Sequence, residues 1–245
     1  MVSKNQIKFI TSLQQKKYRN QHGMFVVEGN KVIFEFLQCG YKPQFIYTLQ
    51  PERFIAFRDI VFEIDFQELK KISSLTNPSD SLAIFQIPEN KPLREQGLLV
   101  ATDALRDPGN LGTIIRLCDW FGVTDLICSE DTVDVYNTKV VQATMGSLAR
   151  VQLHYLDLSD FLKKTSLPVF GAFMEGENVY QVPLPQEGIL VMGNESHGIS
   201  KEIERLITQK ISIPRFGELQ QTESLNVATA TAILLNEFRR NFSGT

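Results

Sequence analysis

The chain has 245 residues, a length that fits one large domain or a small domain beside a medium one. Hydrophobic residues make up 43% of the sequence and charged residues 22%, which is typical of a globular protein and excludes collagen-like, coiled-coil and disordered chains. No stretch reaches the ~20 consecutive apolar residues that a bilayer span requires, and the first residues lead into no apolar signal core. We therefore expect a cytosolic protein that does not enter a membrane.

Charge is distributed unevenly along the chain. The formal net charge is −3, but residues 1–31 carry a net charge of +5, which leaves −8 for residues 32–245. A basic surface of this kind can face the phosphates of a nucleic acid. A short basic run also fits a solvated helix face, so charge alone leaves both interpretations open. The basic residues of the segment are Lys4, Lys8, Lys16, Lys17, Arg19 and Lys31.

The cysteines give no sign of a disulfide framework or of a metal site. Cys39, Cys118 and Cys128 are odd in number and show neither CxxC nor Cys/His ligand spacing. This pattern is typical of cysteines that remain free thiols. Two of the three lie inside apolar runs, which is typical of buried cysteines. We expect no metal.

The first part of the chain predicts a small α/β domain. Apolar runs of strand length occur at 24–27, 45–48 and 83–86. Helical patterns occur at 4–16, 30–38 and 66–71. The segment 87–97 that follows is polar and contains Pro88 and Pro92, which is typical of a linker. We therefore predict a first domain over 1–92 and a second domain over 98–245.

The second domain alternates strand-length apolar runs with helical patterns. The predicted strands are 98–101, 125–128, 151–156, 169–173, 188–192 and 210–213. The predicted helices are 111–121, 138–146, 159–164, 200–208 and 224–240. This alternation predicts βαβ units, and hence an α/β fold with a mostly parallel sheet that helices cover on both faces.

Three loops of the second domain carry the candidate site, because ligands of a parallel α/β sheet bind beyond the carboxyl ends of its strands. The loop at 103–112 leads into a helix that we expect Asn110 to cap. Arg116 lies between one and two turns further along, where its guanidinium can reach back toward the loop. Taken alone, the pattern also fits a helix cap followed by a surface arginine.

The second and third loops add polar residues beside glycine and proline. The second loop presents Glu195 and His197 between Gly193 and Gly198, and glycines let a ligand approach the backbone closely. The loop is not a GxGxxG motif, so a dinucleotide site is not favoured.

In the third loop, Pro214 follows a strand, Ser224 is expected to cap the last helix, and Asn226 lies in its first turn. Serine and asparagine at a helix start also commonly serve only the backbone.

Together and in this order, the three loops resemble the motifs of the SpoU (TrmH) family of RNA ribose 2′-O-methyltransferases, of the SPOUT class. The matching residues are Asn110, Gly112 and Arg116, then Gly193, Glu195 and Gly198, then Pro214, Ser224, Leu225, Asn226 and Val227. The stretch 139–147 is similar to the segment between the first two motifs, and 25–29 is similar to the substrate-binding domain that many members carry. The stretch 215–223 is longer than the family pattern.

The resemblance implies a C-terminal trefoil knot, S-adenosylmethionine as the cofactor, and a homodimer whose active site uses both subunits. It implies that the cofactor is bound by Met192, Gly193, Asn194, Gly198, Ile213, Pro214, Ser224, Leu225 and Asn226. It also implies an RNA substrate, with ribosomal RNA favoured over transfer RNA. We assign RNA binding to Lys4, Lys8, Lys16, Lys17 and Arg19, and expect that removing residues 1–92 abolishes RNA binding but not cofactor binding.

The resemblance gives Arg116 the central part in catalysis. A guanidinium holds its proton too tightly to act as a base, so we expect Arg116 to bind the adjacent phosphate and to stabilise the developing alkoxide. Glu195 is expected to orient Arg116. Asn226 and Ser224 are expected to hold the ribose or the methionine end of the cofactor, and Asn110 completes the predicted catalytic set.

Other functions remain open at this point. A non-catalytic RNA-binding protein on the same fold, a transfer RNA 2′-O-methyltransferase, and a knotted methyltransferase that acts on a base nitrogen would all share much of this sequence. The presence together of Arg116, Glu195 and Asn226 speaks against the first of these. A nicotinamide-dependent enzyme is disfavoured because the GxGxxG motif is missing.

Overall fold

The computed structural model describes residues 2–216 and 224–240. The predicted insertion at 215–223 therefore falls almost entirely outside the described residues. The chain forms two compact units, and we describe each by itself. The first unit comprises Met1–Glu89 and Asp134–Ala149, and the second comprises Asn90–Val133 and Arg150–Thr245. The segment Asp134–Ala149 thus belongs in space to the first unit, although it lies within the predicted second domain in the sequence.

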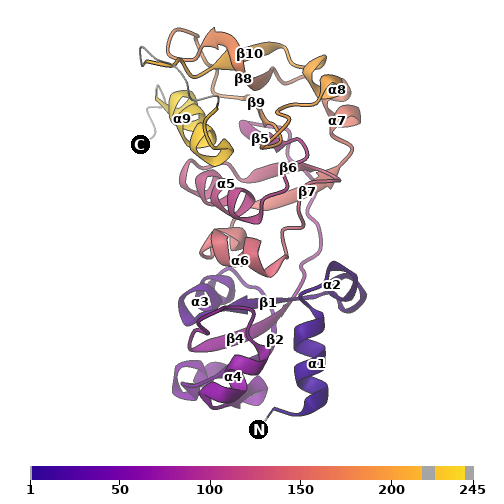
Figure 1. Cartoon of the computed structure of the whole chain (residues 1–245), viewed down its shortest axis with the longest axis vertical. Helices are drawn as coiled ribbons and strands as arrows, with labels where there is room; N and C mark the ends of the chain where they lie inside the picture. Colours follow the sequence, from indigo (N-terminus) through magenta and orange to yellow (C-terminus); the bar gives the residue numbers. More distant parts are fainter. Residues whose placement is uncertain (1, 217–223, 241–245) are drawn as a thin grey trace. The chain divides into compact units, whose positions relative to one another are not determined.

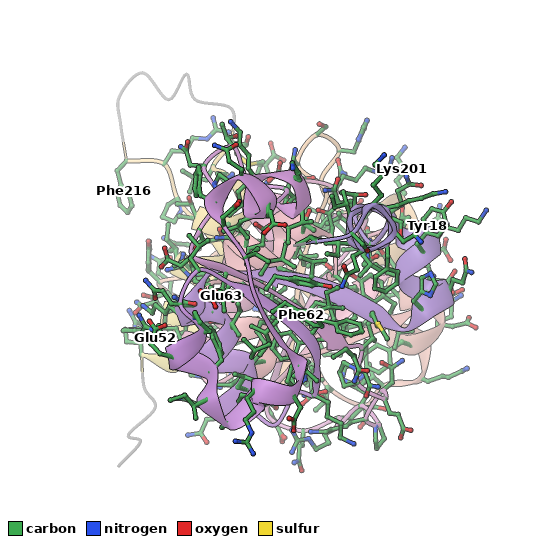
Figure 2. All side chains as sticks on the ribbon, turned by 90° about the horizontal axis from the view of Figure 1, so that it is seen from below. Tyr18, Glu52, Phe62, Glu63, Lys201 and Phe216 are labelled. Atoms are coloured by element: carbon green, nitrogen blue, oxygen red, sulfur yellow. The ribbon has the colours of Figure 1, made fainter. Side chains whose placement is uncertain are left out.

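The first unit is built on a mixed four-stranded sheet in the order β1-β4-β2-β3 (Figure 1). Its strands are β1 (Met24–Glu28), β2 (Pro43–Thr48), β3 (Val61–Glu63) and β4 (Ser81–Gln86). β4 is antiparallel to both neighbours, and β3 is parallel to β2. At the β3 edge, the ring of Phe62 (labelled in Figure 2) stacks on Tyr47 with the ring centroids 5.2 Å apart. β3 and the 3-10 segment η1 (Pro51–Ile60) before it were not predicted.

Helices cover both faces of this sheet. On one face, α1 (Lys4–Ser12) and α4 (Phe66–Ile72) bury Ile10 and Leu69 against strand residues such as Ile84. On the other face, α3 (Asn30–Gln38) and the segment Asp134–Ala149 meet an aromatic cluster. Its rings belong to Phe25, Phe36, Tyr41, Phe85 and Tyr136.

The predicted helix over 4–16 is in fact two helices. α1 ends at Ser12, and α2 (Lys16–His22) begins after a three-residue connection. α2 ends at Gly23, whose φ of 63° is left-handed and therefore favours glycine. The break turns Arg19 into the protein: its guanidinium donates to the carbonyl oxygens of Leu13 and Gln14 and pairs with Asp134.

The second unit contains a six-stranded sheet in the order β10-β8-β9-β5-β6-β7. Its strands are β5 (Leu98–Thr102), β6 (Asp125–Ser129), β7 (Gln152–Leu156), β8 (Val169–Asn178), β9 (Gly188–Met192) and β10 (Gln209–Ser212). All five neighbouring pairs are parallel, which confirms the predicted α/β class. The trefoil knot remains a prediction.

Helices pack on both faces of the parallel sheet (Figure 1). One face carries α5 (Pro108–Trp120) and α9 (Val227–Arg239), which contact each other, and Phe238 of α9 meets Phe170 edge to face. The opposite face carries α7 (Leu158–Lys164) and α8 (Lys201–Glu204). α8 is much shorter than the predicted helix over 200–208, because its last turn ends at Arg205 and β10 already begins at Gln209.

β8 is longer than predicted because its pairing with β10 is interrupted by a long bulge and then resumes. Lys210 of β10 pairs with Gly171, but the next residue, Ile211, pairs with Glu177. The intervening residues of β8 therefore leave the ladder. Gly176 allows the return, since a Cβ atom there would lie 2.9 Å from the backbone carbonyl of Lys210.

Neither a membrane span nor a metal cluster is found in the part of the chain that the structure describes. None of the helices described there is long and apolar enough to cross a bilayer. Within residues 2–216 and 224–240, no group of three or more His, Cys, Asp or Glu side chains is placed to hold a metal ion.

Candidate active site

The three predicted loops meet at the carboxyl edge of the parallel sheet. β5 and β9 are neighbours in the sheet. The loops that follow them are hydrogen-bonded at their first residues, because the amide of Asp103 donates to the carbonyl oxygen of Met192 at 2.9 Å. The buried carboxylate of Asp103 also accepts a bond of 2.7 Å from the amide of Ser200, at the start of α8. Asp103 therefore ties both ends of the loop 193–199 to β5.

The loop after β5 ends in a well-capped helix, but its cap is not the predicted one. The side chain of Asp107 accepts from the amide of Asn110 at 2.8 Å, and Pro108 fills the first helical position. Proline is favoured there because its missing N–H would be unsatisfied in any case. The helix therefore begins three residues before the predicted start, which frees the Asn110 side chain for another contact.

The loop after β9 is a tight turn that closes on its own backbone. Asn194 and Gly198 exchange backbone hydrogen bonds of 2.9 Å, and the Asn194 side chain accepts from the amides of Ser196 and His197. A Cβ atom on Gly193 would lie 2.2 Å from the carbonyl carbon of Gly198. Glycine is therefore required at 193 for the turn to close, and close approach of a ligand to this loop stays a prediction. His197 is exposed, with its ring Nδ1 3.2 Å from Asn194 Oδ1.

Glu195 lies at the amino end of α5. Its carboxylate accepts from the backbone amides of Arg106 (3.3 Å) and Asp107 (3.0 Å) and from the side chain of Asn110 (3.1 Å). Partial burial opposes ionisation of Glu195, but these donors prevail and lower its pKa below the ordinary value for a glutamate. The contacts are therefore present at neutral pH and are lost only as the pH falls through this lowered pKa.

The predicted pairing of Glu195 with Arg116 is not found. The described residues show no ion pair between the two, because Glu195 is bound at the start of α5 and Arg116 lies six residues beyond Asn110, about 9 Å along the helix axis. A carboxylate at a helix amino terminus is favourable in its own right. Arg116 is exposed, and among the residues that the structure describes its side chain has no hydrogen-bond or ionic partner.

Asn226 joins the third loop to the first two. It caps α9, where its side-chain oxygen accepts from the amides of Ala228 and Thr229. Its side-chain nitrogen donates to Asn110 Oδ1 at 2.9 Å, and Asn110 in turn donates to Glu195. One hydrogen-bonded chain, Asn226–Asn110–Glu195, thus connects the three loops. Ser224, predicted as the cap, is exposed and lies two residues before the actual cap.

The three loops line a cleft of about 1660 Å³, which exceeds the ~300–1,000 Å³ typical of small-molecule sites. All predicted cofactor-binding residues contribute to its wall: Met192, Gly193, Asn194, Gly198, Ile213, Pro214, Ser224, Leu225 and Asn226. Asn110 and Glu195 line it as well, whereas Arg116 does not. Leu225 remains 48% exposed, so an apolar wall is open to a ligand here.

Two features of the site were missed from the sequence: the anchoring role of Asp103, which does not line the cleft, and the bulge of β8, which does. Asp103 could have been found, because it is a polar residue directly after a buried strand. The bulge of β8 contributes Phe173, Met174 and Glu175 to the wall, and only the glycines at its ends signal it in the sequence. The ring of Phe173 lies 4.8 Å from the ammonium group of Lys210, which also pairs with Glu204.

Four of the five residues assigned to RNA binding are exposed: Lys4, Lys8, Lys16 and Lys17. The assignment of Arg19 to RNA binding is wrong, because its side chain is only 2% exposed and is bound to Asp134 and to two carbonyl oxygens. A guanidinium enclosed in this way has no surface to offer to a phosphate. Its sequence neighbours Lys16 and Lys17 gave no hint of this difference, since α2 was not predicted.

We expect Gly193→Ala to weaken S-adenosylmethionine binding by about tenfold or more, which corresponds to ~1.4 kcal/mol of loop distortion. The new methyl group would meet the backbone at 198–199, so the turn that lines the cleft must open. Calorimetric titration measures the loss. Gly198→Ala is the matched control: a Cβ atom there meets nothing within 4 Å, and only its φ of 67° is strained. Equal affinities for wild type and Gly193→Ala would refute this role of the turn.

Comparison with known proteins matches both parts of the chain to family models. Residues 97–236 match the SpoU rRNA methylase family, and residues 4–83 match the MRM3-like substrate-binding domain. The chain is also 28% identical over 245 residues to the 23S rRNA (guanosine(2553)-2'-O)-methyltransferase RlmP of Bacillus subtilis, with 97% of each sequence covered.

Solved structures give the same result. A TrmH-family structure from Porphyromonas gingivalis is 40% identical and superposes with a TM-score of 0.89, covering 98% of this chain and 99% of that one. The AdoMet-bound rRNA methyltransferase from Sinorhizobium meliloti is 30% identical with a TM-score of 0.88, covering 100% of this chain and 98% of that one. The similarity thus extends over both units.

Proposed function

The chain belongs to the SpoU rRNA methylase family, and from this membership and its cleft we propose that it transfers a methyl group from S-adenosylmethionine to a ribose 2′-hydroxyl of ribosomal RNA. The observation that carries the proposal is the hydrogen-bonded chain Asn226–Asn110–Glu195, which holds the three motif loops around one cleft. The substrate class rests on the relatives, which are named as ribosomal RNA methyltransferases.

The cleft suits S-adenosylmethionine. An apolar wall at Met192, Ile213 and Leu225 can take the adenosine part, and the polar loop residues around Asn226 can take the charged methionine end. When bound, this cofactor supplies an electrophilic methyl group. The protein must then hold the ribose hydroxyl in line with that group and stabilise the charge that develops on its oxygen.

We assign the charge stabilisation to Arg116. Its guanidinium is exposed and, within the described residues, free of any intramolecular partner, so it is available to RNA. Its positive charge binds a phosphate and the developing alkoxide, while a phosphate or a water molecule takes the hydroxyl proton. Glu195 and Asn110 act as positioning residues, since they fix the start of the helix that carries Arg116.

The first unit is proposed to bind the RNA. Its match to a substrate-binding domain supports this, together with the exposed side chains of Lys4, Lys8, Lys16 and Lys17. Family membership further supports a trefoil knot, a homodimer whose site uses both subunits, and a place in the cytoplasm with ribosomal RNA.

The decisive experiment is an analysis of methylated nucleosides. Unmodified ribosomal RNA and, in a separate reaction, unmodified transfer RNA, both transcribed in vitro, are incubated with the protein and methyl-labelled S-adenosylmethionine. Each RNA is then digested and examined by mass spectrometry. We expect the label on a ribose 2′-O-methyl nucleoside. Label on a base would assign the protein to base-nitrogen methylation. RNA binding without any label would make it a non-catalytic RNA-binding protein, and label only on transfer RNA would change the substrate.

A further inference from the structure

Arg106 has a side chain that the fold does not use. It lies between β5 and α5, directly before the cap residue Asp107. Its guanidinium is 74% exposed and lies 4.0 Å from the carboxylate of Asp131, which is itself 56% exposed. An ion pair this long between exposed groups contributes little to stability. Within the described residues, the Arg106 side chain makes no hydrogen bond.

The backbone that carries Arg106 is, in contrast, held at several points. The amide of Arg106 donates to Glu195, and the carbonyl oxygen of Leu105 accepts from Val133 at 2.8 Å. Ala104 donates to Ser129 Oγ at 2.8 Å and accepts from the Asn194 side chain at 2.7 Å.

Ala104 also has a φ of 56°, a left-handed conformation that a residue with a Cβ atom keeps only where its surroundings enforce it. The loop therefore presents a freely exposed guanidinium from a fixed point.

That fixed point adjoins the cleft. Glu195, which accepts from the amide of Arg106, is part of the cleft wall. The cleft wall carries no excess of positive charge, since Glu175, Glu195 and Glu204 are balanced by Lys201, Lys210 and Arg215. A polyanionic strand that enters here needs local cations.

We propose that Arg106 binds a phosphate of the RNA strand beside the target ribose, as a second guanidinium contact in addition to Arg116. The planar guanidinium can bind a phosphate through two parallel hydrogen bonds. Asp131 holds it too loosely to compete. The inference rests on the proposed function, and it adds a phosphate contact in the second unit to the lysines proposed for the first unit.

The test compares RNA and cofactor binding by variants of the full chain, with unmodified 23S ribosomal RNA transcribed in vitro as the probe. For Arg106→Ala we expect the KM for RNA to rise by about five- to tenfold, with kcat and S-adenosylmethionine affinity unchanged. The slope of log affinity against log salt should become shallower by about 0.7–0.9, the value for one lost phosphate contact. Arg106→Lys keeps the charge but loses the planar pair of donors, so its KM should lie between those of wild type and alanine, with the salt slope of wild type.

Two further variants serve as controls. Arg205→Ala removes an exposed arginine from the same unit that does not line the cleft, and it should leave the KM and the salt slope unchanged. Asp131→Ala removes the loose partner of Arg106 and should leave RNA binding equal or tighter.

The proposal is overturned if Arg106→Ala behaves like wild type, if Arg205→Ala has the same effect, or if Arg106→Ala loses cofactor binding, which would reveal a structural role. If wild type binds this RNA without methylating it, the proposed function fails, and the salt slope still decides the role of Arg106.

Discussion

Arg116→Ala is expected to lower the single-turnover rate of ribose methylation by about 10²–10³-fold, the effect of removing one donor to a developing oxyanion. Arg116 is exposed on α5, outside the cleft wall, and no described residue is hydrogen-bonded to its side chain. Its loss should therefore leave the fold and the cofactor affinity unchanged. An interaction made mainly in the transition state affects turnover rather than binding.

The measurement is rapid-mixing turnover with enzyme in excess over RNA, accompanied by calorimetry with S-adenosylmethionine. Arg116→Lys is the matched variant: it keeps the charge but loses the planar pair of donors, so its rate should lie between those of wild type and alanine. A near-normal rate for Arg116→Ala would remove this residue from the mechanism and move attention to the Asn226–Asn110–Glu195 chain.

Arg19→Ala is expected to destabilise the protein by about 3–5 kcal/mol, the usual effect of removing one partner of a buried ion pair. The substitution leaves Asp134, whose side chain is 15% exposed, without its cation, and leaves two carbonyl oxygens without a donor. Chemical denaturation monitored by circular dichroism measures the change.

Lys17→Ala, on the same helix, is exposed and should change the stability by less than about 0.5 kcal/mol while weakening RNA binding. The double variant Arg19→Ala/Asp134→Ala should be less destabilised than the sum of the two single variants, because it leaves no unpaired charge behind. If Arg19→Ala instead keeps full stability and loses RNA affinity as Lys17→Ala does, the surface interpretation of Arg19 is correct.

Strands of the parallel sheet could be predicted closely because their apolar runs are short, continuous and bounded by polar residues. The prediction for β9 was correct to the residue, at 188–192, since Gly188 and Gly193 mark its ends. β8 was predicted too short, because periodicity follows a regular ladder and the bulge before Glu177 interrupts it. The break after Ser12 was missed for a related reason: no proline or glycine marks it, and tertiary packing of Arg19 decides it.

The candidate site could be predicted as a set of loops but not as a set of contacts. The motif residues line one cleft, apart from Gly112 and Arg116, yet both predicted helix caps were wrong. Asp107 and Asn226 cap the helices instead of Asn110 and Ser224. In the first case the proline at 108 was the decisive signal, because it marks the first helical position. The hydrogen bond between Asn110 and Glu195 could not be predicted from the sequence, because it depends on β5 and β9 being neighbours in the sheet.

Because Asp134–Ala149 belongs to the first unit, a deletion of residues 1–92 removes only part of that unit, and the survival of cofactor binding after this deletion stays a prediction. This segment places Tyr136 against Phe25 and offers Asp134 to Arg19, so the deletion would expose an aromatic ring and leave a carboxylate unpaired. The chain passes from one unit to the other three times, after residues 89, 133 and 149.

This arrangement also sets the order of events during synthesis on the ribosome. A domain that is continuous in sequence can fold as soon as its last residue emerges, as amino-terminal domains generally do. Here one face of the amino-terminal sheet is covered by α3 alone until residue 149 has left the exit tunnel, by which time β5, α5 and β6 of the other unit have also been made. The first unit is therefore completed only after part of the second unit has been made, and a stall between residues 90 and 133 would leave the Phe25, Phe36 and Phe85 cluster without Tyr136.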